Sequence, residues 1–128
     1  MQIPLNSSQP KRPPLELCSI KLYSTGLRKI FTNHFYKSMN HNFGVEITIR
    51  NNTNQSQSMR IGGCVYDDKG MVIVRWNSTK NINAISSNSY DFYAKEQTFS
   101  KMKEGKYKIQ FWINDKKVQK EYFTVTYK

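Results

Sequence analysis

Apolar and polar residues alternate with the period of a β-strand in several stretches of this chain. The clearest stretch is 43–50, where every second position is apolar. Those positions are Phe43, Val45, Ile47 and Ile49. Successive side chains of a strand point to opposite faces of its sheet, so this pattern predicts a strand with one face buried in a core.

Seven stretches in all predict strands. They are 15–23, 43–50, 59–66, 71–76, 90–94, 106–113 and 118–127. Asp67-Asp68-Lys69-Gly70 separates the third and fourth strands and predicts a hairpin, because Asp and Gly readily adopt the backbone geometry of a tight turn. The charged residues 114–117 separate the last two strands, and this hairpin is the strongest local signal in the chain.

The remaining segments are more polar or less regular. Residues 51–58 and 77–89 are predicted to be polar loops. Residues 27–42 are compatible with a short helix, an irregular edge strand or a long connection. All four prolines lie in residues 1–14, which predicts a flexible tail or linker ahead of a domain at 15–128.

Short strands at regular intervals, without a long amphipathic helix, predict an all-β fold, and we favour an antiparallel β-sandwich over a barrel. Three stretches resemble the framework of an immunoglobulin-like or fibronectin III-like β-sandwich of about seven strands. They are 43–51, which ends in Asn51, 65–70 with its Asp-x-x-Gly turn, and 105–109 with Gly-x-Tyr-x-Ile. The resemblance covers roughly residues 15–127 and implies a spacer, an adhesion module or a partner-binding accessory domain.

Gly105-Lys106-Tyr107 resembles the tyrosine-corner position of these domains, in which a tyrosine hydroxyl bonds to the backbone a few residues upstream. The Cys…Trp…Cys core of antibody domains is absent, because Cys18 and Cys64 lie on other strands. The resemblance therefore implies no antibody-like disulfide.

The composition fits one globular domain. The chain has 128 residues, of which 38% are hydrophobic and 13% aromatic, enough for a single core and too many for complete disorder. No apolar run approaches the roughly 18–20 residues of a membrane span, which excludes a transmembrane protein. The first eight residues lack the pattern of a secretory signal. We expect a cytoplasmic location if Met1 is the native start, and an extracytoplasmic one if a signal was removed.

The sequence shows no constellation of residues that is typical of catalysis. The two histidines, His34 and His41, are seven residues apart with no acidic residue between them, which matches neither a zinc-protease helix nor a catalytic triad. The Gly62-Gly63 pair lies in a strand-like run and indicates a bulge or a close backbone approach. An enzyme would require His34, His41 and Cys64 to converge, and we expect no catalytic residues.

Metal and cofactor sites are not expected either. Turn chemistry explains Asp67 and Asp68, since a calcium loop needs further oxygen ligands at alternating positions. Cys18 and Cys64 fit no zinc pattern. They are compatible with two half-buried thiols or with a bridge between two strands.

The chain is strongly basic, with 20 Lys+Arg, 9 Asp+Glu and a formal charge of +11. Nine of the cations lie in residues 95–128, around the last predicted hairpin. Odd-numbered positions are apolar in both strands of that hairpin, and burying both sets requires a turn with an odd number of loop residues. The even-numbered positions then form an outer face. Its candidate binding residues are Lys106, Lys108, Trp112, Lys120 and Tyr122.

This outer face supports two interpretations. It is a binding surface whose aromatic side chains anchor a polyanion or an acidic partner, or a solvated face whose lysines discourage edge-to-edge pairing. Lys outnumbers Arg fifteen to five, and specific base readout usually depends on Arg. We expect a non-catalytic protein-interaction or accessory module with an unidentified protein partner. The alternative is a polyanion-binding domain for nucleic acid, an anionic glycan or an acidic membrane surface.

Overall fold

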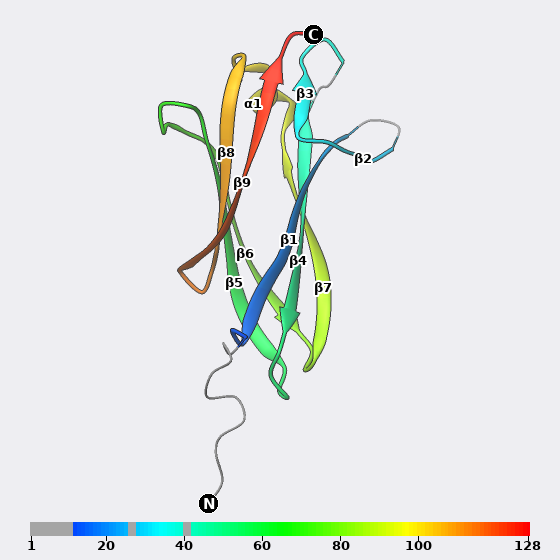
Figure 1. Ribbon diagram of the computed structural model, residues 1–128, viewed down its shortest axis with the longest axis vertical. Helices are drawn as coiled ribbons and strands as arrows, with labels where there is room; N and C mark the ends of the chain where they lie inside the picture. The colour runs from blue at the N-terminus through cyan, green and yellow to red at the C-terminus, as the bar shows by residue number, and fades with distance from the viewer. Residues whose placement is uncertain (1–11, 26–27, 40–41) are drawn as a thin grey trace, which may run out of the picture.

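Two mainly antiparallel β-sheets face each other and enclose the hydrophobic core (Figure 1). The computed structural model describes residues 12–25, 28–39 and 42–128. In this part of the chain the elements are β1 (Leu15–Ser24), β2 (Ile30–Phe31), β3 (His34–Tyr36), β4 (Phe43–Asn51), β5 (Gln57–Tyr66), β6 (Val72–Ile82), β7 (Ser86–Ala94), α1 (Glu96–Ser100), β8 (Gly105–Ile113) and β9 (Lys116–Thr126). The four-stranded sheet has the order β2-β1-β4-β7, and the five-stranded sheet has the order β3-β9-β8-β5-β6. The predicted all-β sandwich is confirmed, with nine strands among the described residues rather than about seven.

The alternation of apolar and polar positions decides which side chains form the core. Val45, Ile47 and Ile49 of β4 are fully buried, and they share one core cluster with the buried apolar side chains of β8. Burial of apolar surface stabilises the fold by roughly 25 cal/mol per Å². Each sheet therefore turns one face inward and leaves the other face to carry the polar side chains.

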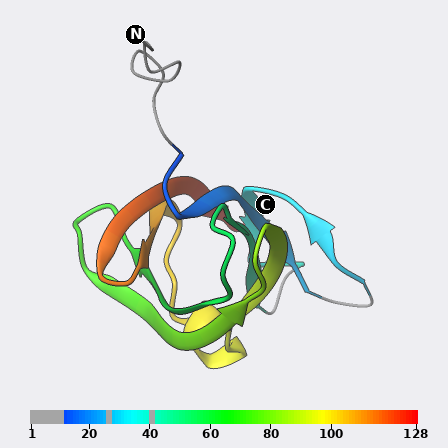
Figure 2. The same ribbon diagram turned by 90° about the horizontal axis from the view of Figure 1, so that it is seen from below.

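The two sheets also approach each other through β1 and β9 on one side and through the edge strands β6 and β7 on the other (Figure 2). On one side, Gln119 of β9 donates a hydrogen bond of 2.5 Å from Nε2 to the carbonyl oxygen of Leu17 in β1. On the other side, Trp76 of β6 donates one of 2.9 Å from Nε1 to the carbonyl oxygen of Tyr93 in β7. These contacts fix the two sheets relative to each other.

Residues 77–89 form strands, and the prediction of a polar loop was wrong. β6 continues to Ile82, and β7 begins at Ser86 after a turn in which Ile85 has a φ of 47°. Both strands lie at the edges of their sheets. Polar side chains on an edge strand stay in water, so the backbone pairs without the apolar alternation that reveals a strand in the sequence.

The described residues of segment 27–42 contain two short strands, β2 and β3, which lie at the edges of the sheets. Of the three predicted alternatives for this segment, the edge strand matches these residues. β2 pairs with β1, and β3 pairs with β9 in parallel. Residues 26–27 and 40–41 lie outside the described residues, as do residues 1–11 of the predicted tail. Pro13 and Pro14 precede β1, and their carbonyl oxygens accept hydrogen bonds from Asn52.

The β8–β9 hairpin buries both of its apolar sets, but by a route that the sequence analysis did not predict. The turn has two residues, Asn114 and Asp115, with φ values of 51° and 67°, as in a type I′ turn. The predicted odd number of loop residues was wrong. A bulge opposite Phe111, between the pairs Gln110–Lys120 and Trp112–Lys117, adds one residue to β9 and restores the parity.

The tyrosine-corner contact is present at the position that the sequence suggested. Tyr107 donates a hydrogen bond of 2.5 Å from its hydroxyl to the carbonyl oxygen of Lys103. Burial of the ring is the main cause that raises the pKa of Tyr107. The contact fastens the segment ahead of β8 to the sheet.

No helix of the described residues is long and apolar enough to cross a membrane.

Candidate binding face

The predicted binding residues come together on the outer face of the five-stranded sheet. β8 and β9 pair so that Lys108 lies opposite Tyr122 and Gln110 lies opposite Lys120. The odd-numbered residues of β8 are buried in the core, so its even-numbered side chains point outward. The residues placed on this one face are Lys106, Lys108, Trp112, Lys120 and Tyr122.

The neighbouring strands extend this face with residues that the sequence analysis did not select. Tyr66 of β5 lies opposite Lys108, and Arg75 of β6 lies opposite Cys64. Lys117 lies opposite Trp112. We call this surface the cationic face. Its charged and aromatic members are Arg60, Tyr66, Arg75, Lys106, Lys108, Trp112, Lys117, Lys120 and Tyr122.

A groove of about 410 Å³ lies on the cationic face over β5. Gly62 lines it, with Trp112 on the β8 side and Arg75 on the β6 side. A Cβ atom at Gly62 would lie 3.9 Å from the Cβ of Trp112 and from the carbonyl oxygen of Trp76, which is ordinary van der Waals contact. The missing side chain at Gly62 therefore keeps the groove open beside the indole ring.

A second hollow of about 310 Å³ follows along the same face, lined among others by Tyr66, Lys106, Lys108 and Tyr122. The Lys108 ammonium lies 5.0 Å from the centroid of the Tyr66 ring, and that of Lys120 lies 5.9 Å from the centroid of Tyr122. These are cation–π distances. Tyr66 lines both hollows, which therefore adjoin each other on this face, and we call the pair the track.

Positive charge prevails on the cationic face. Arg60 forms an ion pair with Asp115, and both line the first hollow, while Asp67 and Asp68 line the second hollow together with Lys106 and Lys108. Asp67 belongs to the β5–β6 turn, where its carboxylate accepts hydrogen bonds from the backbone amides of Lys69 and Met71. The turn role predicted for the aspartates is thus confirmed for Asp67.

Tyr66 stands between the two hollows as a neutral phenol. Its hydrogen bond with Cys64 is the largest cause that raises the pKa of Tyr66, and burial raises it further. Cys64 is a buried free thiol, and Cys18 on β1 is an exposed one. The structure therefore contains no bridge between them.

His34 and Cys64 lie on different strands of the five-stranded sheet. His34 of β3 pairs its Nε2 with the hydroxyl of Thr126 at 2.8 Å, while Cys64 lies on β5 with β9 and β8 in between. His34 and Cys64 therefore do not converge, and His41 lies outside the described residues. No group of three His, Cys, Asp or Glu in the described residues could hold a metal ion.

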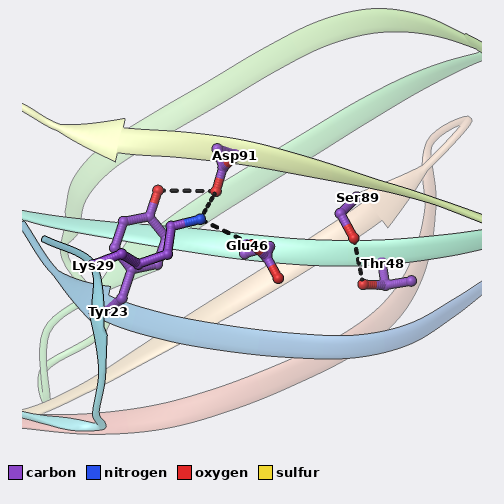
Figure 3. Close-up of polar contacts among 6 residues, drawn as sticks. All are labelled: Tyr23, Lys29, Glu46, Thr48, Ser89 and Asp91. Atoms are coloured by element: carbon purple, nitrogen blue, oxygen red, sulfur yellow. Dashed lines mark hydrogen bonds and ion pairs between the residues drawn. The ribbon is translucent and has the colours of Figure 1, made fainter.

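A second polar cluster, which the sequence analysis missed, lies on the outer face of the four-stranded sheet (Figure 3). We call it the Tyr23 cluster, made of Tyr23, Lys29, Glu46 and Asp91. The Tyr23 hydroxyl donates to Asp91 Oδ1 at 2.9 Å. The Lys29 ammonium lies 2.9 Å from Glu46 Oε1, 3.1 Å from Asp91 Oδ1 and 4.4 Å from the centroid of the Tyr23 ring.

The Tyr23 cluster is closed by its own contacts. Although it belongs to an outer face, the Tyr23 residue is only 1% exposed, because its ring lies over Gly44 and meets Phe31 and Tyr93 edge to face. Burial is the largest cause that raises the pKa of Tyr23 well above its usual value. The hydrogen bond to Glu46 is the largest cause that raises the pKa of Lys29. Both groups hold their protons at neutral pH.

The sequence contained a partial signal for each of these features. Glu46 alternates with apolar residues in β4, which placed it on an outer face, but nothing in the sequence pairs it with a lysine 17 residues upstream. Gly62-Gly63 interrupts the alternation in β5 and hides the outward positions of Tyr66 and Arg60. At Gly63 the close neighbour is a side chain rather than the predicted backbone, since a Cβ there would lie 2.7 Å from the Phe111 ring.

Comparisons with known proteins establish the fold alone. No family model matches the chain, and no curated protein matches it. Solved structures do match. A β-glucosidase from Erythrobacter marinus aligns with a TM-score of 0.64 at 10% identity over 87% of this chain. A glycoside hydrolase family 3 β-glucosidase from Bifidobacterium adolescentis aligns with a TM-score of 0.63 at 13% identity over 87%.

A third similar structure is the alkylpurine DNA glycosylase AlkC from Pseudomonas fluorescens, bound to DNA that contains an abasic-site analogue. It aligns with a TM-score of 0.62 at 8% identity over 88% of this chain. The present chain covers 30% of that glycosylase, 17% of the Bifidobacterium enzyme and 15% of the Erythrobacter enzyme. The fold thus makes up a minor part of much longer enzymes.

Proposed function

We propose that this chain is a non-catalytic accessory module with an immunoglobulin-like β-sandwich fold, and that it binds an acidic partner through the cationic face. The observation that carries the proposal is the gathering of six cations and three aromatic rings on one sheet face, which contains two adjoining hollows. Aromatic side chains supply contact area at an interface, while the charges attract and orient a partner of opposite sign.

Two further observations support an accessory role. The tyrosine-corner contact of Tyr107 is typical of immunoglobulin-like sandwiches. The similar solved structures are enzymes in which the matching part is 15–30% of the chain. A module of this kind positions a catalytic domain or a substrate without taking part in the chemistry.

Binding of a polyanion is the second candidate function. It is favoured by the spacing of the cations, because Lys106 and Lys108 lie two positions apart on one strand, about 7 Å at the rise of a β-strand. Lys120 lies opposite the next outward position, Gln110. A row of charges at this interval suits a polymer that carries a negative charge on every unit.

A charge-reversal experiment tests the proposal. Lys106, Lys108 and Lys120 are replaced together with Glu, and the control carries Glu at Lys21, Lys80 and Lys95, which are exposed and lie outside the cationic face. Both variants change the net charge equally. We expect binding to a heparin column and to an acidic protein ligand to be lost, at least a hundredfold, only in the first variant. Equal loss in both variants would show that net charge alone attracts anions, and no loss would overturn the proposal.

A further inference from the structure

The track on the cationic face has the length of a short polymer segment. It runs along β5 from Arg60 past Gly62 to Tyr66, and the six steps between these seven residues of a strand span about 20 Å. At the duplex rise of about 3.4 Å per nucleotide of one strand, this distance covers about six nucleotides, and fewer in a stretched strand. The track therefore accommodates several units of a linear ligand.

Aromatic rings recur along this track. Trp112 borders the first hollow, Tyr66 stands between the two hollows, and Tyr122, which is 55% exposed, lines the second. Beside Trp112, Gly62 has no side chain to fill the groove. Planar rings of a ligand can thus stack at more than one point.

Each ring has a cation as its neighbour. Lys117 lies opposite Trp112, Lys108 lies near Tyr66 and Lys120 lies near Tyr122. A ligand that alternates flat rings with negative charges satisfies both kinds of side chain at once. Nucleic acid has this alternation, with a base and a phosphate in each unit.

From this arrangement we infer that the ligand of the cationic face is single-stranded nucleic acid, whose bases stack in the two hollows while the lysines contact its phosphates. The inference rests on the proposed function, because it names the ligand of the same face. A single strand is required, since a duplex keeps its bases stacked on one another. Stacking on aromatic rings is tolerant of base identity, and lysine contacts to phosphate carry no sequence information. Binding is therefore independent of sequence.

Acidic peptides and sulfated glycans fit the face less well. They satisfy the cations, but they carry no aromatic bases to stack on Trp112, Tyr66 and Tyr122. These two ligand classes serve as competing probes in the test.

The test compares two oligomers with the same charge. One is a fluorescent oligothymidylate of about twelve nucleotides, and the other is an abasic deoxyribose-phosphate chain of the same length. We expect the abasic chain to bind at least about fivefold more weakly, because each stacked base contributes roughly a five- to hundredfold gain in affinity. The logarithm of the affinity for oligothymidylate falls with the logarithm of the salt concentration with a slope of about −3, for about four phosphates contacted.

Two variants test whether oligothymidylate binds in the first hollow. Gly62→Leu fills the groove without a backbone clash at its Cβ, and we expect it to weaken oligothymidylate binding about tenfold. Ser58→Leu adds the same side chain on β5 outside the groove lining, and its binding stays within about twofold. Unfolding midpoints of both variants are measured alongside, so that a folding defect is recognised.

The outcomes separate the inference from the proposed function. Equal affinity for the two oligomers, or tighter binding of a heparin oligosaccharide or a polyglutamate peptide, overturns the nucleic-acid inference and leaves an anion-binding face in place. Undetectable binding of all four probes at low salt overturns both. A Gly62→Leu variant that folds and binds oligothymidylate like the unmodified protein also overturns the inference.

Discussion

The two outer faces of this sandwich differ in whether their charges are paired and in whether their aromatic rings are covered. On the four-stranded sheet, Lys29 is held by two carboxylates and Tyr23 is covered by its neighbours. On the five-stranded sheet, the lysines outnumber the acids and the Tyr122 ring is exposed over a hollow. A face whose charges are satisfied internally stabilises the fold, whereas a face with surplus charge and open rings is suited to a partner.

The glycine of each face offers the sharpest test of this contrast. A Cβ at Gly44 would lie 2.5 Å from the Tyr23 ring, whereas at Gly62 its nearest contact would be 3.9 Å. We expect Gly44→Ala to lower the free energy of unfolding by about 3 kcal/mol, because the ring must move out of its packed position. Gly62→Ala changes it by less than about 0.5 kcal/mol. Urea denaturation measures both, and equal effects would contradict the comparison.

Removing the Tyr23 hydroxyl has the next largest effect. Tyr23→Phe loses the hydrogen bond to Asp91, and we expect the free energy of unfolding to fall by about 1.5 kcal/mol at pH 7, as for a bond to a charged acceptor. Tyr122→Phe on the cationic face is the matched control, because the Tyr122 ring is exposed. An equal loss in both variants would mean that the bond to Asp91 adds no stability.

The same variant has a predicted pH dependence. The pKa of Tyr23 is raised in the folded state, so its contribution is fully present below about pH 10, the usual value for tyrosine. Above pH 10 the unfolded chain loses this proton while the folded chain keeps it, and stability falls as pH rises. We expect the stability difference between the unmodified protein and Tyr23→Phe to shrink between pH 10 and pH 11. A difference that stays constant over this range would contradict the raised pKa.

The smallest expected effects on stability concern single lysines. Lys29→Gln removes two ion pairs and a contact with the Tyr23 ring, so we expect a small decrease in the unfolding midpoint that diminishes further at high salt. Lys108→Gln leaves the midpoint unchanged but weakens binding of an anionic ligand. A reversed pattern, with stability lost at Lys108 and binding lost at Lys29, would exchange the roles of the two faces.

Much of the fold was predictable because local alternation and turn chemistry carry it. The core positions of β4 and of the β8–β9 hairpin followed from period two, and the turn at Asp67–Gly70 followed from its residue types. The edge strands β6 and β7 were predicted too short, since Asn, Ser and Thr side chains in water leave no such period. The β9 bulge escaped prediction because a two-residue turn and a bulge give the same parity as an odd turn.

The candidate site was predictable only where it lies on one hairpin. Lys106, Lys108, Trp112, Lys120 and Tyr122 share a face by parity alone. Arg75 and Tyr66 join them through the pairing of β5 with β6 and β8, which depends on strand order across the sheet. The Tyr23–Asp91 bond joins residues 68 apart in the chain, and no local pattern reports such a contact.

A titration followed by backbone amide NMR tests the central claim most directly, because both outer faces are observed in one experiment. Oligothymidylate of about twelve nucleotides is added to the labelled protein at low salt. The account predicts progressive shifts at Gly62, Trp112 and Tyr122 and at the Trp112 indole, with Gly44 and Asp91 unchanged. Shifts centred on Gly44 and Asp91, or no shifts on either face, would contradict it.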